Sequence, residues 1–222
     1  SACVRRSLPE RVTLVAVSKT HPAELIREAY EAGHRIFGES RPQELAAKYG
    51  ALPKDIEWHM IGHLQTNKVK LIAPFVALIH SADSERLIRV INDEAIRNGR
   101  VIDILLEIHV ADEETKSGWT YDALLKYVKS GALAAMKGVR VRGVMGIATY
   151  TSNEFRVRLD FELLLQYKKE LEAYFDSSFD TLSMGMSDDY PLALDYGTTM
   201  VRIGSLIFGK RDYAAAEKEA TV

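Results

Sequence analysis

Residues 12–22 read VTLVAVSKTHP, an apolar stretch that ends abruptly in a lysine. Thr13–Val17 is a continuous run of residues that suit burial, which is typical of a parallel strand covered on both faces. Lys19 follows directly where that strand ends, and Pro22 lies in the first turn of a helical pattern. Thr20 is the residue predicted to cap this helix. The stretch therefore predicts a strand–turn–helix unit with an amine at the carboxyl end of the strand.

The same unit recurs along the chain. Ser84–Gly99 and Asn153–Phe175 are predicted helices, because their apolar residues repeat at helical spacing. Strands are predicted at Thr13–Val17, Arg35–Gly38, Glu57–Ile61, Val76–His80, Ile102–Val110, Val141–Ile147, Thr181–Met184 and Met200–Ile203. Eight strands with seven intervening helices, and one more helix after the last strand, indicate a parallel sheet.

Eight such units within 222 residues favour a closed (β/α)8 TIM-type barrel, with residues 1–222 forming one domain. An open doubly wound sheet is the alternative. No G-x-G-x-x-G motif follows the first strand, so the usual fingerprint of a dinucleotide-binding sheet is missing.

Composition narrows the class of protein. The chain has 29 basic and 31 acidic residues, so no charge field of one sign points to nucleic acid or to an anionic membrane. The single cysteine, Cys3, excludes an intrachain disulfide and is compatible with a reducing compartment. The first residues lack the apolar core of a signal peptide, and the run Leu71–Ala82 is too short to cross a bilayer. We expect a cytoplasmic, soluble monomer, since a single barrel buries its own core.

Two glycine–serine turns follow the seventh and eighth predicted strands. They are LSMGMSDDYPLALDYG (182–197) and VRIGSLIFGKR (201–211). Gly185 and Gly204 allow backbone N–H groups to approach a ligand, while Ser187 and Ser205 offer hydroxyl groups, as a phosphate site requires. Arg202 adds further hydrogen-bond donors near the same place. The simpler interpretation is that these segments are only turns and helix starts.

Closure of the barrel would bring both turns beside Lys19, because strands seven, eight and one become neighbours. Loss of water around a half-buried lysine favours its neutral, nucleophilic amine. An amine next to a phosphate pocket suggests a phosphorylated carbonyl compound, and both pyridoxal phosphate (PLP) and an aldol-type sugar phosphate stay open. Asp188 and Asp189 would repel a phosphate, so they are interpreted as helix-start residues that point to solvent.

Seven stretches together resemble the pyridoxal phosphate homeostasis proteins, small PLP-binding barrels related to the alanine racemase N-terminal domain. They are LVAVSKTHP, RIFGES, WHMIGHLQTNKVK, KSGW, VRGVMGIATY, LSMGMSDDYPLAL and VRIGSLIFGKR, in the family's order. The resemblance implies a Schiff base between PLP and Lys19, with Ser187, Gly204 and Ser205 holding the phosphate. It also implies that Arg202 lies beside the pyridine nitrogen and helps to hold the phosphate. An arginine there keeps the nitrogen unprotonated, which makes the ring a weaker electron sink.

The resemblance further implies storage or delivery of PLP in vitamin B6 homeostasis, without robust turnover, and PLP-dependent apo-enzymes as recipients. Racemisation needs a base on each face of the substrate. In alanine racemases the second base is a tyrosine from a β-rich domain, which we expect this chain to lack. Tyr150, Tyr190 and Tyr213 are weighed as substitutes, although a packed or surface tyrosine is the simpler interpretation of each. A PLP-dependent amino-acid racemase of low activity and a Schiff-base aldolase stay open as alternatives.

A serine, a pair of histidines and a charged segment also bear on function. Ser40 stands where the family has asparagine, and its shorter side chain leaves that residue's contact with the cofactor open. His59 and His63 would lie about 13 Å apart in a strand, and two histidines make an incomplete zinc site, so no metal is expected. The segment HVADEETKSGW (109–119) is either a mobile flap or a long loop, and the spacing gives its Lys116 no role.

Overall fold

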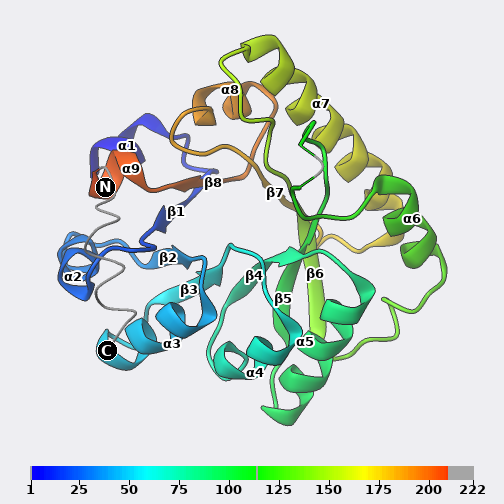
Figure 1. Cartoon of the computed structure of the whole chain (residues 1–222), viewed down its shortest axis with the longest axis horizontal. Coiled ribbons are helices and arrows are strands. Elements are labelled where there is room, and N and C mark those ends of the chain that lie inside the picture. Colours follow the sequence, from blue (N-terminus) through cyan, green and yellow to red (C-terminus); the bar gives the residue numbers. More distant parts are fainter. Residues whose placement is uncertain (1, 114, 210–222) are drawn as a thin grey trace.

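The computed structural model describes residues 2–113 and 115–209, which form a closed barrel of eight parallel strands. Neighbouring strands pair in sequence order, and β1 closes the ring by pairing with β8 (Figure 1). The strands are β1 (Thr13–Val17), β2 (Ile36–Glu39), β3 (Glu57–Met60), β4 (Leu78–Ala82), β5 (Ile102–Glu107), β6 (Val139–Met145), β7 (Thr181–Ser183) and β8 (Met200–Ile203). The TIM-type barrel is confirmed, and the open sheet is excluded.

Helices surround the barrel, and those between α1 and α9 connect one strand to the next on its outside (Figure 1). They are α1 (Ala2–Ser7), α2 (Ala23–Glu31), α3 (Pro42–Ala51), α4 (Val69–Ile72), α5 (Glu85–Arg97), α6 (Tyr121–Lys129), α7 (Glu154–Leu171), α8 (Tyr190–Asp195) and α9 (Ser205–Phe208). Two 3-10 turns, Thr66–Lys68 and Glu172–Tyr174, adjoin α4 and α7. That residues 1–222 form a single domain stays a prediction, and Arg211 and Tyr213 lie outside the described residues.

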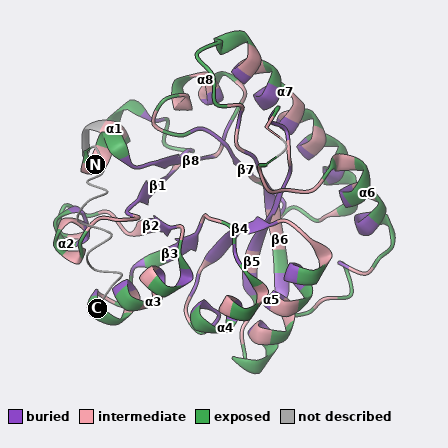
Figure 2. Ribbon diagram, in the orientation of Figure 1, coloured by how far each residue is buried: buried purple, intermediate pink, exposed green. Residues whose placement is uncertain are grey.

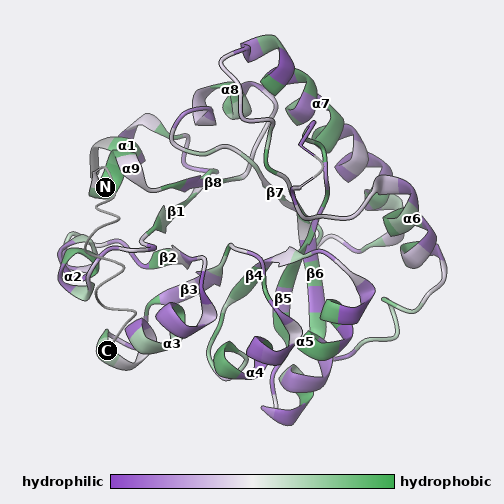
Figure 3. Ribbon diagram, in the orientation of Figure 1, coloured by the Kyte–Doolittle hydropathy of each residue, from purple (hydrophilic) through white to green (hydrophobic). Residues whose placement is uncertain are grey.

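Most of the apolar core lies between the strands and the helices. Trp58, Phe37 and Phe161 are among its largest fully buried side chains. Figure 2 shows the strands almost entirely buried, whereas the longer helices are buried on one side only. Figure 3 shows the same helices banded in hydrophilic and hydrophobic colours, which is the pattern of helices that cover a core. Burial of this layer is the main free-energy gain of folding.

A second, smaller apolar cluster fills the inside of the barrel. It joins Val15, Leu78, Leu105, Met145 and Met200, which come from five different strands. Alternate residues of a strand point to the same side, so the inward positions nearer the carboxyl ends of the strands lie two residues further along. The carboxyl ends of the strands, here called the barrel mouth, are where (β/α)8 proteins place their sites.

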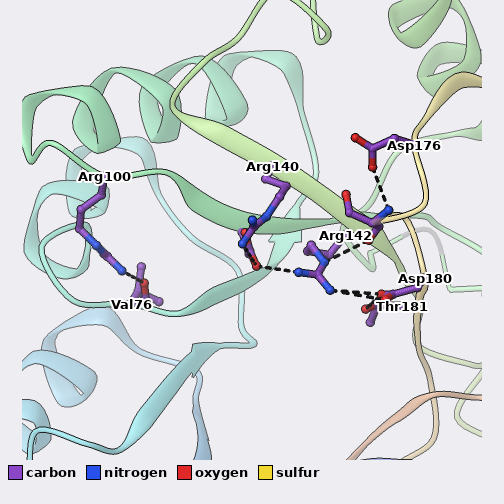
Figure 4. A network of polar contacts seen from close by, with 9 residues as sticks. Val76, Arg100, Arg140, Arg142, Asp176, Asp180 and Thr181 are labelled. Atoms are coloured by element: carbon purple, nitrogen blue, oxygen red, sulfur yellow. Dashed lines mark hydrogen bonds and ion pairs between the residues drawn. The ribbon is translucent and has the colours of Figure 1, made fainter. Parts of the chain in front are cut away.

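The amino ends of β5, β6 and β7 carry an ion-pair network at the opposite end of the barrel (Figure 4). Arg140 donates to both carboxylate oxygens of Asp103 at 2.7 and 2.9 Å. Arg142 lies between Asp103 and Asp180, at 3.4 and 3.5 Å. The sequence predicted a strand that starts at Val141, but β6 begins at Val139. Arg140 and Arg142 occupy outward-facing positions of this strand, where the carboxylates of the neighbouring strands pair with them. Charges here contribute to the scaffold and lie away from the mouth.

Helix starts follow the sequence signals in two cases of three. Ser84 accepts a hydrogen bond from the N–H of Leu87, and Asn153 accepts one from the N–H of Phe155. The prediction of Thr20 as a cap was wrong. Pro22 occupies the cap position of α2, and the Thr20 hydroxyl donates instead to the carbonyl of Lys19. Thr20 therefore belongs to the loop before α2 and not to the helix cap.

Candidate functional site

The loop after β1 carries Lys19 at the barrel mouth. Ser18 continues the strand pairing, since its N–H donates to the carbonyl of Gly38 at 3.0 Å. The chain then turns sharply, and the N–H of His21 donates back to the carbonyl of Ser18 at 3.1 Å. Lys19 itself is half-buried, whereas its position in the sequence left a solvated lysine and a half-buried amine equally open. Thr20 has a φ of 67°, the left-handed region that a β-branched residue rarely adopts.

The turns after β7 and β8 meet each other and the end of β1. The hydroxyl of Ser187 accepts a hydrogen bond from the N–H of Gly204 at 3.3 Å. A Cβ added to Gly204 would lie 3.0 Å from the carbonyl oxygen of Val17, so this turn approaches β1 as closely as a glycine allows. The rings of His21 and Phe208 are 5.2 Å apart, which joins the loop after β1 to α9. The structure therefore gathers these three segments at one rim.

Gly204 precedes α9, whose first residue, Ser205, is exposed. The first N–H groups of a helix have no acceptor within the helix, which makes this a suitable place for an anion. Gly185 has a φ of 95°, and a Cβ there would lie 2.8 Å from the Cβ of Ala193. Gly185 is thus required by its backbone conformation, whereas an added Cβ at Gly204 would make a tight contact with Val17. Whether Ser187, Gly204 and Ser205 hold a phosphate stays a prediction.

The two aspartates of the β7 turn differ. Asp188 is exposed, as predicted. Asp189 is half-buried, so the prediction that it points to solvent was wrong. Its carboxylate accepts the N–H of Met186 at 2.6 Å and thereby closes the turn. Burial raises the pKa of Asp189, and the positive charge of Arg202 opposes that rise.

Arg202 lies inside the barrel, below the rim. It is 4% exposed, and its Nη1 donates to the carbonyl and the hydroxyl of Ser183 at 3.0 and 2.6 Å. Nη2 donates to the carbonyl of Gly146 at 3.0 Å. Burial lowers the pKa of Arg202 to about 10, against the opposing effects of Asp189 and Glu107. The guanidinium therefore stays charged at neutral pH and is fixed by three hydrogen bonds.

A pair of buried histidines continues this contact across the barrel, and sequence reasoning missed it. Nδ1 of His80 lies 3.2 Å from the hydroxyl of Ser183, and Nε2 of His80 lies 3.0 Å from Nδ1 of His59. Arg202 donates to the hydroxyl oxygen of Ser183, so Ser183 donates its own hydrogen to Nδ1 of His80. A neutral His80 then carries its hydrogen on Nε2 and donates it to Nδ1 of His59. Burial lowers the pKa of His59 to about 3 and that of His80 well below its ordinary value. Both rings are therefore neutral at pH 7.

Glu107 completes the polar inner layer. It is 4% exposed, its Oε1 accepts from the hydroxyl of Ser117 at 2.8 Å, and burial raises its pKa. His80, Glu107 and Arg202 each lie two residues beyond Leu78, Leu105 and Met200 of the inner apolar cluster. The sequence signal for this layer was a single polar residue near the carboxyl end of an apolar strand, as His80 is in β4, Glu107 in β5 and Arg202 in β8.

The segment after β5 is tied down at both ends. The N–H of Trp119 donates to the carbonyl of Glu107 at 2.7 Å, and its Nε1 donates to the carbonyl of Ala82 at 3.0 Å. Lys116 donates to the carbonyl of Ala148 at 2.8 Å. A cavity of about 200 Å3 lies under this segment and is lined in part by Glu107, Lys116 and His109. These bonds describe a folded-back loop for the residues on either side of position 114.

Comparisons with known proteins agree with this architecture. The family model for the alanine racemase N-terminal domain matches residues 2–212. The pyridoxal phosphate homeostasis protein of Aquifex aeolicus is 42% identical over 214 residues, which cover 96% of this chain and 93% of that protein. The Escherichia coli protein of the same name is 39% identical over 212 residues, covering 93% and 88%. This chain belongs to the pyridoxal phosphate homeostasis protein family.

Solved structures of the family superpose closely. PipY of Synechococcus elongatus, a structure without PLP, has a TM-score of 0.88 at 37% identity and covers 94% of this chain and 97% of its own. The same protein with PLP bound gives a TM-score of 0.85. Alanine racemase from Bartonella henselae, with a TM-score of 0.68 at 16% identity, shares the barrel fold over 93% of this chain and 57% of its own.

Neither a metal site nor a membrane-spanning helix occurs among the described residues. Among residues 2–113 and 115–209, no cluster of three or more histidine, cysteine or acidic side chains is arranged to hold a metal ion. His63 instead lies 3.1 Å from Asp83, and His59 contacts His80. None of the helices in the described part of the chain has both the length and the apolar character needed to span a membrane.

Proposed function

We propose that this protein binds PLP at the barrel mouth as a non-catalytic carrier in PLP homeostasis, with Lys19 as the covalent attachment point. The observation that carries the proposal is the meeting of three segments. The loop of Lys19 contacts α9 through His21 and Phe208, and Gly204 approaches Val17 and bonds Ser187. This meeting of segments supports an amine and an anion site at one rim of the barrel.

The donor set fits a phosphorylated aldehyde. Gly204 leaves a space that a Cβ would fill, and the hydroxyl groups of Ser187 and Ser205 suit phosphate oxygens. PLP supplies an aldehyde that a lysine amine attacks reversibly, with loss of one water. In this proposal Lys19 supplies that amine. The family relationship supports the ligand, since the related proteins are named for PLP homeostasis and PipY has a PLP-bound structure.

Arg202 is proposed to face the pyridine nitrogen. Its guanidinium is anchored below the rim by Ser183 and Gly146, which favours a contact with a ring at the mouth over one with a phosphate at the rim. A charged arginine has only donors, so it holds a facing nitrogen unprotonated. That arrangement limits how well the ring accepts electrons from a substrate.

The placement of tyrosines supports a carrier over a racemase. Tyr150 is 90% exposed, and Tyr190 packs against the apolar cluster of Leu14 and Val201. These are the placements of a surface tyrosine and of a packed one, and Tyr213 lies outside the described residues. We further propose that the protein is a monomer and that PLP-dependent apo-enzymes receive its cofactor. The closed barrel, which buries its core without a partner, supports the first of these.

The test is borohydride reduction of the purified protein with PLP, followed by peptide mapping. We expect a reduced adduct on Lys19 alone, and loss of that adduct in Lys19→Ala. Lys19→Arg is the matched control: it keeps a cation at the site and should still bind PLP without a covalent bond. An adduct on another lysine would refute the attachment point. Turnover of a sugar phosphate by PLP-free protein would favour the aldolase, and Lys19-dependent exchange of an amino acid's α-hydrogen with solvent would favour the racemase.

A further inference from the structure

A cluster of three charged side chains lies directly behind the Lys19 loop. Glu39 ends β2, while Glu44 and Lys48 lie one turn apart on α3. Lys48 Nζ lies 2.7 Å from Oε1 of both carboxylates. Glu39 is fully buried and Lys48 is 8% exposed, so the pair is held in a region with little water. We name Glu39, Glu44 and Lys48 the α3 charge cluster.

The α3 charge cluster binds the residues on both sides of Lys19. The hydroxyl of Ser18 donates to Oε1 of Glu39 at 2.6 Å, and the carbonyl of Ser18 accepts from Lys48 at 2.8 Å. On the other side, the N–H of Thr20 donates to Oε1 of Glu44 at 2.7 Å. The residues before and after Lys19 are thus bonded to the α3 charge cluster, with Lys48 and Glu44 holding the backbone and Glu39 holding the Ser18 hydroxyl.

The conformation of Thr20 makes the last of these bonds important. It has a positive φ, and within residues 2–113 and 115–209 it is the only residue other than glycine that does. Such a conformation persists only where the surroundings hold it. The bond to Glu44 is a charge-assisted contact of the strong kind, and it acts at the strained residue itself. Without it, the loop has reason to relax to an ordinary turn and to carry Lys19 with it.

We propose that Glu44 and Lys48 are positioning residues for Lys19, which hold its backbone so that the amine meets a carbonyl ligand in the reactive orientation. This inference rests on the proposed function, because it assigns the α3 charge cluster a role in attachment at Lys19. The two residues act on the rate at which the amine joins the aldehyde carbon and releases water. The turns proposed to hold the phosphate follow β7 and β8, whereas these two residues lie on α3.

The experiment compares a ligand that can attach with one that cannot. PLP attaches through its aldehyde, whereas pyridoxine 5′-phosphate carries an alcohol there and reports only on the ring and phosphate contacts. For Glu44→Ala we expect PLP attachment, followed by absorbance and by borohydride trapping, to slow about threefold to tenfold, the effect of one lost hydrogen bond. Pyridoxine 5′-phosphate affinity should stay within about twofold. Glu44→Gln keeps an acceptor for the N–H of Thr20 and should restore the rate.

Lys48→Met is the stronger perturbation and has a matched control. Lys168 is 9% exposed and forms an ion pair with Glu172 one turn away on a distant helix, so Lys168→Met removes a similar lysine without touching the Lys19 loop. We expect slowed attachment in Lys48→Met and unchanged attachment in Lys168→Met. If Lys48→Met does not fold, the Glu44 pair decides. Glu44 and Lys48 line a groove of about 800 Å3, so water can enter where the Glu44 carboxylate is removed.

The outcomes separate this inference from the proposed function. A wild type that forms no adduct on Lys19 would overturn both. A wild type that attaches PLP at Lys19, with Glu44→Ala attaching at the same rate, would overturn the positioning role alone. Slowing by Glu44→Ala that Glu44→Gln does not reverse would overturn the role given to the bond with Thr20, because the charge of Glu44 would then be the cause.

Discussion

The buried histidine pair makes the stability of the barrel depend on acid, and one substitution tests this. His59 is fully buried, and burial lowers its pKa from 6.5 to about 3. In the unfolded chain the ring takes up a proton near pH 6.5, but in the folded barrel it stays neutral. The unfolded state therefore binds more protons below pH 6.5. Stability is fully present above that pH and is lost as the pH falls toward the folded pKa.

The size of the effect follows from the shift. Each pH unit between the two pKa values changes the free energy of unfolding by about 1.4 kcal/mol per proton. Between pH 7 and pH 5, His59 alone should lower it by roughly 2 kcal/mol. His80 adds a loss of the same sign, because its pKa is also lowered by burial. Glu39 acts in the opposite direction, since burial raises its pKa to about 7 and the folded state gains a proton there.

The assay is urea unfolding at pH 7 and pH 5 for the wild type and His59→Asn. Asparagine keeps an acceptor near the position of Nδ1, so the Nε2–H of His80 retains a partner. We expect the variant to lose roughly 2 kcal/mol less than the wild type on acidification, because the contribution of Glu39 cancels in the difference. His63→Asn, at an exposed histidine, is the control and should change the loss far less. Equal losses in wild type and His59→Asn would refute the assignment of a neutral, buried ring.

Two glycine substitutions give further tests. Gly204→Ala would place a Cβ 3.0 Å from the carbonyl oxygen of Val17 and push the β8 turn away from β1 and Ser187. PLP should therefore bind about tenfold more weakly, while the thermal midpoint changes little. Calorimetric titration with PLP measures the affinity, and an unchanged affinity would argue against the proposed phosphate site. Gly143→Ala would place a Cβ 1.8 Å from the carbonyl oxygen of Thr181 at a φ of 153°, so we expect a loss of about 4 kcal/mol or more, or no folded protein. A soluble Gly143→Ala protein with a wild-type thermal midpoint would contradict the β6–β7 register.

The barrel and its rim were predictable because their signals are local. Thr13–Val17 and Met200–Ile203 are short, mostly apolar segments followed directly by turn residues, and both were predicted with their observed bounds. The two glycine–serine turns follow from strand order alone, since closure makes β7, β8 and β1 neighbours. Lys19 stands out because nothing else in its strand is charged. These features needed no knowledge of how side chains from distant strands meet.

The inner polar layer and the α3 charge cluster were not predictable in the same way. The predicted strand Val76–His80 ended at His80, whereas β4 runs from Leu78 to Ala82, because the N–H of Val76 still bonds the carbonyl of Ile72. With that boundary wrong, the inward position of His80 was hidden. Lys48 presents the opposite difficulty. A lysine on a helix normally marks a solvated face, and only the approach of β2 behind α3 buries it against Glu39.

The closure of the ring between its first and last strands has a consequence for synthesis. Lys19 and Gly204 are 185 positions apart (204 − 19), yet β1 and β8 lie side by side. At about 5–20 residues per second, the lysine leaves the ribosome on the order of ten seconds before the glycine exists. Under the proposed function, a nascent chain thus contains the amine that attaches PLP before it contains the last of the turns proposed to hold the phosphate. Tight binding of PLP would then require a chain that has been synthesised through β8. A ligand that bridges the two strands would hold the last strand against the first.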